Sequence, residues 1–269
     1  MKPRLFLNGA TVMTTATDRV LELARNAGFD GIEARAERLL ERPNEARATK
    51  ASARPHQVWS LNGVRLSLHS DGSLDRQTLE ADLRPRLEIC EELGADYLLA
   101  VPPRIPGLSP SAAMKGIREG LELVRDEAIV FGSSKQVAFE FLGFRDCPIN
   151  TPALAGEVVD QVDEIDLVLD SCHWHASGSG SLDEFPCGQL VMVHLNDAPE
   201  KPPREIEDAD RVLPGEGVIR LRDLLDELKR RGYRGPYSLE TFNPTYWQES
   251  PEEVARRGKT ALDLLFSSL

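Results

Sequence analysis

The sequence has no long hydrophobic run and only a few cysteines. No apolar stretch approaches the ~18 residues of a membrane-spanning helix, and the charged, strand-like start at Met1 does not read as a secretion signal. The four cysteines are scattered and form no CxxC pair, which is typical of free thiols in a reducing compartment. We therefore expect a cytoplasmic protein that does not enter a membrane.

Positive charge is also scarce. The chain has 32 lysines and arginines against 44 acidic residues, so its formal net charge is −12. A protein that binds nucleic acid or an anionic membrane needs a basic surface to displace counterions. The balance therefore disfavours both partners. It favours a small molecule that is neutral or is held through a metal ion.

What the sequence does contain is a repeated alternation of short hydrophobic runs and amphipathic stretches. The predicted strands are 4–9, 31–35, 64–69, 96–101, 136–141, 166–170, 189–196 and 236–241. The predicted helices are 17–27, 44–61, 75–93, 110–131, 151–162, 181–186, 218–231 and 251–266. Near-continuous apolar strands that alternate with helices predict a parallel sheet covered by helices, which is an α/β fold.

Eight such units predict a single (β/α)8 TIM barrel, with one domain over residues 1–269. An open, doubly wound sheet is the structural alternative. That fold usually carries a GxGxxG loop after its first strand, and Asn8-Gly9-Ala10 does not match this motif. We therefore favour the closed barrel.

Four predicted strands in the C-terminal half each carry, at or near the C-terminal end, a residue that can bind a metal ion. The residues are Glu140, Asp170, His194 and Glu240. The active sites of TIM barrels lie at the C-terminal ends of the strands, where these side chains would converge. Three carboxylates and one imidazole suit one divalent ion, and Mn, Mg, Co and Zn all tolerate this set. Separate structural ion pairs are the alternative.

Further polar residues lie next to the predicted strand ends. His173 forms a DxxH pair with Asp170 and could face the site, with Trp174 beside it as an apolar wall. His69 would end the third strand, either as a hydrogen-bond donor to substrate or as a rim residue. Arg211 lies in the segment DRVLPGEG. That segment either crosses the barrel mouth toward the substrate or only forms a turn.

Five segments together carry a family resemblance. VAFEFLG, LVLDSCHWH, VMVHLNDAP, DRVLPGEG and YSLETFNP resemble the sugar phosphate isomerase/epimerase family of xylose-isomerase-like TIM barrels, and within it the 2-keto-myo-inositol isomerase group. The likeness spans the chain and is strongest from residue 136 onward. It implies that the four strand-end residues bind one divalent ion, that His173 contacts the substrate and that Arg211 sits in a substrate-side loop. Glu33 and Arg35 are further pocket candidates in the less similar half.

The resemblance implies a divalent-metal-dependent isomerase or epimerase of a small keto-sugar or keto-polyol, such as an inosose. The reaction would be proton transfer through a metal-bound enediolate, with Glu140 and Glu240 as the acid and base. A metal-dependent dehydratase of the 3-dehydroshikimate or inosose type on the same scaffold is the alternative, because both reactions begin with proton loss beside a carbonyl. A homo-oligomer is possible in this family.

Two other classes of function are less compatible with the sequence. An endonuclease IV-like repair enzyme needs three metal ions and nine His, Asp and Glu ligands, whereas this chain has 5 histidines in all. The sequence also has Asp208-Ala-Asp210 where that site needs a DxH. A barrel that only binds metal or sugar is a third class, and the intact ligand set argues against an enzyme that has lost its activity.

Overall fold

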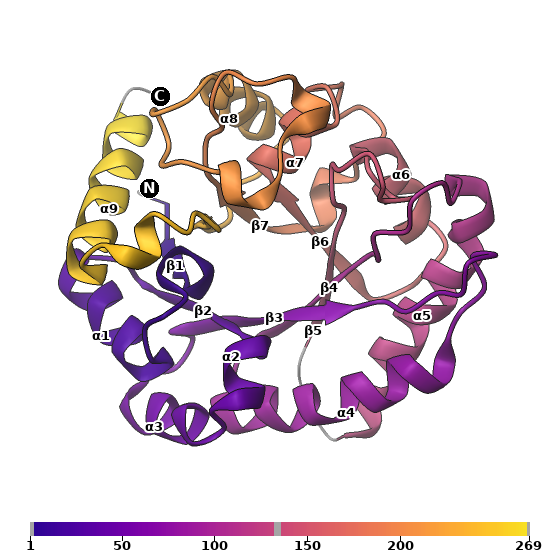
Figure 1. Cartoon of the computed structure of the whole chain (residues 1–269), viewed down its shortest axis with the longest axis horizontal. Coiled ribbons are helices and arrows are strands. Elements are labelled where there is room, and N and C mark those ends of the chain that lie inside the picture. Colours follow the sequence, from indigo (N-terminus) through magenta and orange to yellow (C-terminus); the bar gives the residue numbers. More distant parts are fainter. Residues whose placement is uncertain (1–2, 132–135, 268–269) are drawn as a thin grey trace.

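The strands form one closed parallel barrel, which confirms the predicted fold. The computed structural model describes residues 3–131 and 136–267, and its strands are hydrogen-bonded in the order β1 to β8, with β8 closing onto β1. They are β1 (Leu5–Asn8), β2 (Gly31–Arg35), β3 (Val58–Arg65), β4 (Tyr97–Val101), β5 (Gln136–Glu140), β6 (Ile165–Asp170), β7 (Leu190–Leu195) and β8 (Tyr237–Leu239). Figure 1 shows the strands at the centre, with the helices outside them.

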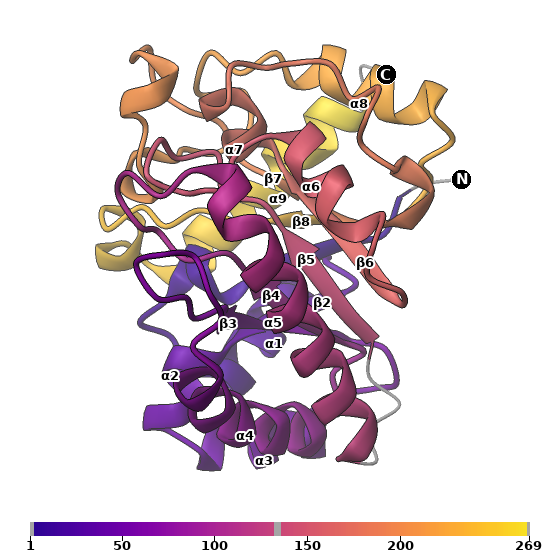
Figure 2. The same cartoon turned by 90° about the vertical axis from the view of Figure 1, so that its right-hand side faces the viewer.

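The helices cover the outer face of this barrel. They are α1 (Thr17–Ala27), α2 (Ala36–Glu41), α3 (Asn44–Ser52), α4 (Arg76–Leu93), α5 (Pro110–Val130), α6 (Pro152–Val159), α7 (Ser171–Ala176), α8 (Leu221–Arg230) and α9 (Pro251–Ser267). In α8 the buried residues are leucines at helical spacing: Leu221, Leu224, Leu225 and Leu228. The long loops that follow the strands gather at one end of the barrel, on the left in Figure 2.

The third strand begins earlier than predicted. We expected it at 64–69, but β3 runs from Val58 to Arg65. Gly63 has a φ of 122°, and the pairing of β3 with β4 shifts register between Asn62 and Val64. Asn-Gly in a polar stretch looks like a turn in the sequence, whereas here it forms an irregularity inside a strand. The predicted helix over 44–61 therefore covers residues that belong to β3.

Two predicted helices were wrong in extent or position. The helical part of 44–61 is only Asn44–Ser52, and the short helix α2 precedes it. The expected helix at 181–186 is absent from this described stretch, which contains turns and bends. The helix after β6 is instead Ser171–Ala176, because the carboxylate of Asp170 accepts a hydrogen bond from the backbone N–H of His173 and caps it.

The barrel interior has an apolar layer beneath a polar one. A cluster separate from the main core fills the lower part, and its buried members are Phe6, Tyr97, Leu99, Ala138, Val168 and Met192. Polar side chains at the strand ends lie above this layer. The layer therefore closes the barrel from below and leaves one open end for a site.

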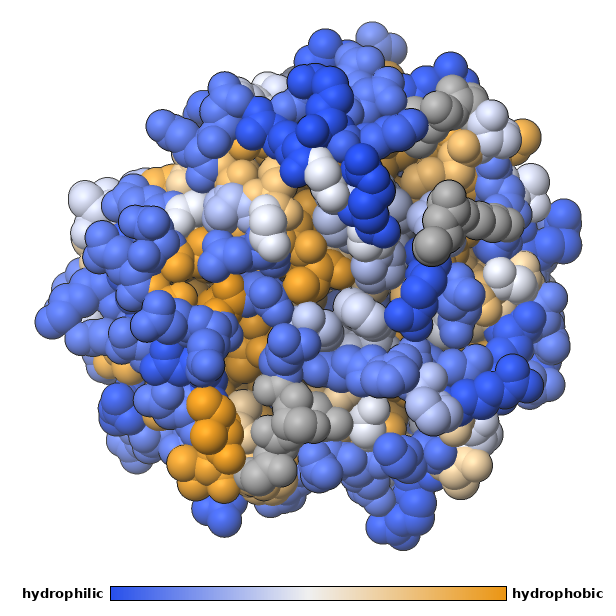
Figure 3. All heavy atoms as spheres, turned by 180° about the vertical axis from the view of Figure 1, so that it is seen from behind, coloured by the Kyte–Doolittle hydropathy of each residue, from blue (hydrophilic) through white to orange (hydrophobic). Residues whose placement is uncertain are grey.

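The outer surface agrees with the polar composition. From behind, most of the rim is hydrophilic, with hydrophobic residues between the polar groups (Figure 3). Within residues 3–131 and 136–267, no helix combines the length and the apolar character that a membrane crossing requires.

Candidate metal centre

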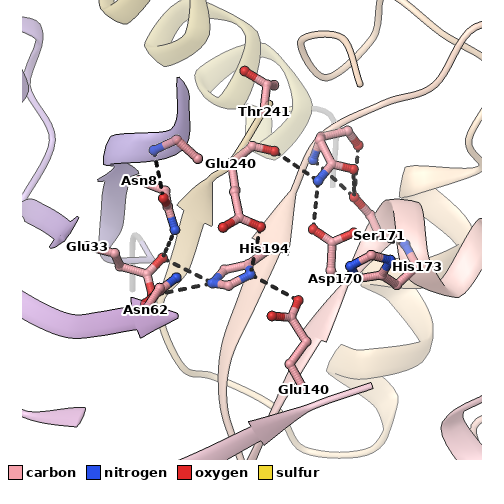
Figure 4. A network of polar contacts seen from close by, with 12 residues as sticks. Asn8, Glu33, Asn62, Glu140, Asp170, Ser171, His173, His194, Glu240 and Thr241 are labelled. Carbon is pink, nitrogen blue, oxygen red and sulfur yellow. Dashed lines mark hydrogen bonds and ion pairs between the residues drawn. The ribbon is translucent and has the colours of Figure 1, made fainter. Parts of the chain in front are cut away.

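The four predicted ligand residues lie together in the structure. Glu140, Asp170, His194 and Glu240 are all buried, and one potential ligand atom from each lies within 4.8 Å of the others. They come from the ends of the consecutive strands β5 to β8, and Figure 4 shows them pointing toward one another. The prediction that these side chains converge is confirmed.

His194 stands at the centre of this cluster. Its Nδ1 atom is 3.2 Å from an oxygen of Glu140 and 3.2 Å from an oxygen of Glu240. Its Nε2 atom is 3.1 Å from Glu33 on the opposite side. Burial lowers the pKa of His194, but the charges of Glu240, Glu33 and Glu140 outweigh burial and hold it well above the ordinary value.

The three carboxylates of the cluster differ in pKa, because their surroundings stabilise the ionised form to different degrees. Burial raises the pKa of Glu140 to about 7, although His194 opposes this. Burial also raises the pKa of Asp170, against the attraction of Arg211. For Glu240 burial acts in the same sense, but His194 and then Arg211 outweigh it and lower the pKa far below the ordinary value. The positive charges of His194 and Arg211 therefore do not fully compensate the negative charges of the three carboxylates.

A divalent ion fits this arrangement. Buried ionised carboxylates are costly unless they are paired or bound to metal. Two ligands on opposite sides of one ion, each at about 2.0–2.2 Å, lie about 4 Å apart, close to the 4.8 Å that contains the four ligand atoms. Three carboxylates and one imidazole are a donor set for Zn, Mn, Co or Mg.

A cavity of about 590 Å³ opens beside the cluster. Glu140 and Glu240 line it, together with His173 and Arg211. Asp170 and His194 are not among its lining residues, so they lie behind the wall. The cluster therefore reaches the cavity through two glutamates that come from opposite sides of the site.

His173 is fixed in one orientation by its neighbours. Its ring meets the edge of Phe144 at a centroid distance of 4.8 Å, with the planes at 89°. A side chain at Gly143 would collide with the backbone carbonyl of His173, so this close approach needs glycine. Burial and the nearby Arg211 hold the pKa of His173 well below its ordinary value, which keeps the imidazole neutral.

Arg211 connects this histidine to the ligands. Its guanidinium donates to Asp170 at 3.1 Å and to Glu240 at 2.9 Å, and its second nitrogen lies 3.0 Å from Nε2 of His173. An arginine only donates, so Nε2 of His173 accepts and Nδ1 carries the ring proton. That Nδ1 atom is buried and has no hydrogen-bond partner among the described residues. It is a donor available on a residue of the cavity wall.

The structure places two other candidates away from the cavity. His69 is exposed in the loop after β3, because that strand ends at Arg65, four residues earlier. Trp174 is buried in the outer core, and its indole N–H donates to the carbonyl of Gly180 at 3.0 Å. Neither belongs to the residues that line the cavity.

The sequence reasoning missed Phe242 as a pocket residue. The guanidinium carbons of Arg35 and Arg211 lie 4.9 and 5.2 Å from the centre of its ring, and all three residues line the cavity. Its position two residues after Glu240 was the available signal. Arg65 also lines the cavity. Arg65 was not recognised as a strand-end residue because the third strand was predicted at 64–69, whereas β3 ends at Arg65.

Comparison with known proteins agrees with this geometry. A family model described as xylose isomerase-like TIM barrel matches residues 21–264. The chain belongs to this family, which the closed barrel and the buried cluster also support.

Particular members of the family resemble the chain over different lengths. An inosose isomerase of Bacillus velezensis is 30% identical over 275 residues, which is 98% of this chain and 97% of that protein. An inosose isomerase of Halalkalibacterium halodurans is 41% identical over 128 residues, which is 46% of this chain and 45% of that protein. A crystal structure of the IolI protein with a bound zinc atom has a TM-score of 0.87 and 27% identity, covering 98% of both chains.

Proposed function

We propose that this protein is a divalent-metal-dependent isomerase or epimerase of a small keto-polyol of the inosose type. One observation carries the proposal. Of a buried cluster of four potential ligands, two members, Glu140 and Glu240, line the neighbouring cavity. Similarity to inosose isomerases over nearly the whole chain supports the substrate class. The zinc atom in the similar IolI structure supports the need for a metal.

The two glutamates are suited to exchange a proton with a bound substrate. A divalent ion in the cluster would act as a Lewis acid on a substrate carbonyl and so acidify the neighbouring C–H. Glu140 and Glu240 approach the cavity from β5 and β8, on different sides of the site. One carboxylate takes the proton from the substrate, and the other, in its protonated form, donates a proton to the adjacent carbon or to the other face. Each keeps a second oxygen for this step if it binds the metal through one.

His173 and Arg211 are suited to orient the substrate. The unpaired Nδ1–H of His173 can donate to a hydroxyl or carbonyl oxygen. Arg211 holds both the imidazole and the carboxylate of Glu240, so the donor and the base keep a fixed separation. The cavity of about 590 Å³ is large enough for a small cyclic polyol.

The test is a panel of inososes and ketoses supplied to the metal-loaded protein in D2O. We expect isomer formation with deuterium incorporated at the carbon beside the carbonyl, followed by NMR. Glu240→Gln should lower kcat by roughly 10²–10⁴-fold, the usual contribution of an acid–base group. Glu22→Gln, on the exposed face of α1, is the matched control and should leave the rate unchanged.

The same experiment separates the alternatives. Formation of an enone with loss of water would identify a dehydratase instead. A Glu240→Gln protein that binds metal and keeps a near-normal rate would contradict the role given to that carboxylate. No turnover of any keto-polyol by the metal-loaded protein would argue against the proposed substrate class.

A further inference from the structure

Glu33 is a buried acid that neither belongs to the ligand cluster nor lines the cavity. It is 1% exposed and lies in β2, whose other residues are apolar up to Arg35. In the sheet it pairs with Asn8 of β1 and Ser60 of β3, so the three side chains lie at one level of the barrel. A buried carboxylate in this position needs a specific partner.

The partner of Glu33 is His194. The carboxylate oxygens of Glu33 lie 3.1 and 3.3 Å from Nε2 of the imidazole. Asn8 donates to the carboxylate at 3.2 Å and Ser60 donates at 2.7 Å. These two hydrogen bonds come from strands on either side of β2 and hold the carboxylate in place. Figure 4 shows Glu33 on one side of the His194 ring and Glu140 on the other.

The two nitrogens of His194 therefore face different chemistry. Nδ1 points to Glu140 and Glu240, which are potential metal ligands. Nε2 points to Glu33, an acceptor. In a neutral imidazole one nitrogen carries the proton and the other has a free lone pair. A metal-binding histidine commonly donates its second N–H to a carboxylate, which selects the tautomer and the ring orientation.

We propose that Glu33 is a positioning residue that accepts Nε2–H of His194 and so directs the Nδ1 lone pair into the cluster. It acts through His194 and does not bind the ion itself. Two of its acceptor positions are already used by Asn8 and Ser60, and the imidazole ring stands between it and the Nδ1 side. This inference rests on the metal centre of the proposed function, but not on its substrate or reaction.

The test measures metal affinity and the position of the ring proton. We expect Glu33→Ala to raise the Kd for Zn²⁺ by 10- to 100-fold, as for other residues that orient a metal-binding histidine. Titration calorimetry of metal-free protein gives the Kd. Long-range ¹H–¹⁵N NMR of the zinc-loaded proteins shows which nitrogen of His194 is protonated. In the wild type it should be Nε2, and in Glu33→Ala this proton should exchange rapidly or move.

Two variants control for loss of folding. Glu33→Gln keeps an oxygen acceptor near Nε2 and should weaken Zn²⁺ binding less than Glu33→Ala does. If Glu33→Ala does not fold, Glu33→Asp draws the carboxylate back by one methylene and should weaken binding in the same direction. Circular dichroism and urea unfolding confirm which variants are folded.

Several results would overturn the proposal. Unchanged Zn²⁺ affinity in folded Glu33→Ala is one, and a protonated Nδ1 in the zinc-loaded wild type is another. A third is equal weakening in Glu33→Gln and Glu33→Ala with the same His194 tautomer as in the wild type, which indicates a general structural role. Failure of the proposed function gives a different pattern. The wild type would then bind Zn²⁺ with Nε2 protonated but convert no keto-polyol.

Discussion

At the scale of single residues, burial keeps His173 neutral. Burial of the imidazole ring is the larger cause and the positive charge of Arg211 the second, and together they lower the pKa of His173 well below the ordinary value. The unfolded chain instead takes up a proton on this residue near pH 6.5. Between pH 6.5 and the lower folded pKa, the unfolded state thus binds more protons than the folded state. His173 therefore makes unfolding easier as the pH falls below about 6.5.

We expect the difference in unfolding free energy between wild type and His173→Gln to depend on pH. The wild type should be the more stable at pH 7.5, because the variant loses the ring contact with Phe144. The difference should shrink below pH 6.5 by up to about 1.4 kcal/mol for each pH unit. Urea unfolding of both metal-free proteins at pH 7.5, 6.5 and 5.5 measures it. Glu140 and Asp170, whose raised pKa values act in the opposite sense, are present in both proteins.

A difference that stays constant over this range would contradict a neutral His173. It would mean that the folded protein takes up the proton as readily as the unfolded chain does.

The sequence predicted the convergence of four potential ligands well, for a physical reason. Glu140, Asp170, His194 and Glu240 each follow an uninterrupted apolar run, so the strand end fixes the direction of the side chain. His69 was expected at the end of a strand over 64–69, but β3 already ends at Arg65. His69 therefore lies in the following loop and does not line the cavity. The contact between Glu33 and His194 joins residues that are 161 positions apart, so no local pattern in the sequence indicates it.

At the scale of secondary-structure elements, one arginine joins three loops at the barrel mouth. Arg104, after β4, donates to Asp146 after β5 at 2.8 Å and to Glu207 after β7 at 2.7 Å. Its guanidinium also lies 4.4 Å from the ring centre of Phe144, the residue that packs against His173. The contacts of Arg104 therefore connect the conformation of these loops to the position of His173 in the cavity wall.

We expect Arg104→Ala to loosen the loops with little effect on global stability. The arginine is one-third exposed, so each ion pair contributes at most about 1 kcal/mol. Limited proteolysis should cut the variant faster around 203–210, where the backbone loses its tie to the neighbouring loop. Arg47→Ala removes an exposed ion pair with Glu92 and is the control, with no change expected at 203–210. Equal cleavage of both variants would show that Arg104 does not restrain the loop.

Two of the features that the sequence did not predict arise at irregular positions of the chain. Gly63 lies inside β3 and breaks its apolar pattern, and Asp170 starts α7 directly at a strand end. Both are irregular features that serve the open end of the barrel, where periodicity is weakest. No other strand has a glycine in its interior, and the positions of the other strands agree with the prediction to within a few residues.

At the scale of the whole molecule, a metal ion would stabilise the fold by mass action. The four potential ligands come from four strands of the closed barrel, so the unfolded chain offers no equivalent site. A free concentration of 100 times the Kd would add about 2.7 kcal/mol to the free energy of unfolding. For a chain of this size, that corresponds to a rise in Tm of roughly 5–10 °C.

We therefore expect the Tm of chelator-treated protein to rise when Mn²⁺ or Zn²⁺ is added. Thermal unfolding followed by circular dichroism measures the shift. Asp170→Asn should abolish most of it, while Asp223→Asn, on the exposed side of α8, should keep it. The same metal-dependent shift in Asp170→Asn would place the bound ion elsewhere.

The two sides of the His194 ring are contacted by residues from different halves of the chain. All four potential ligands lie after residue 136, whereas Glu33, Asn8 and Ser60, which hold the far side of the imidazole, lie before residue 66. Substitutions in the first half can therefore change which ion the protein prefers, and how tightly, while every ligand stays the same. For this barrel, the potential ligands and the residues that adjust one of them lie in separate parts of the sequence.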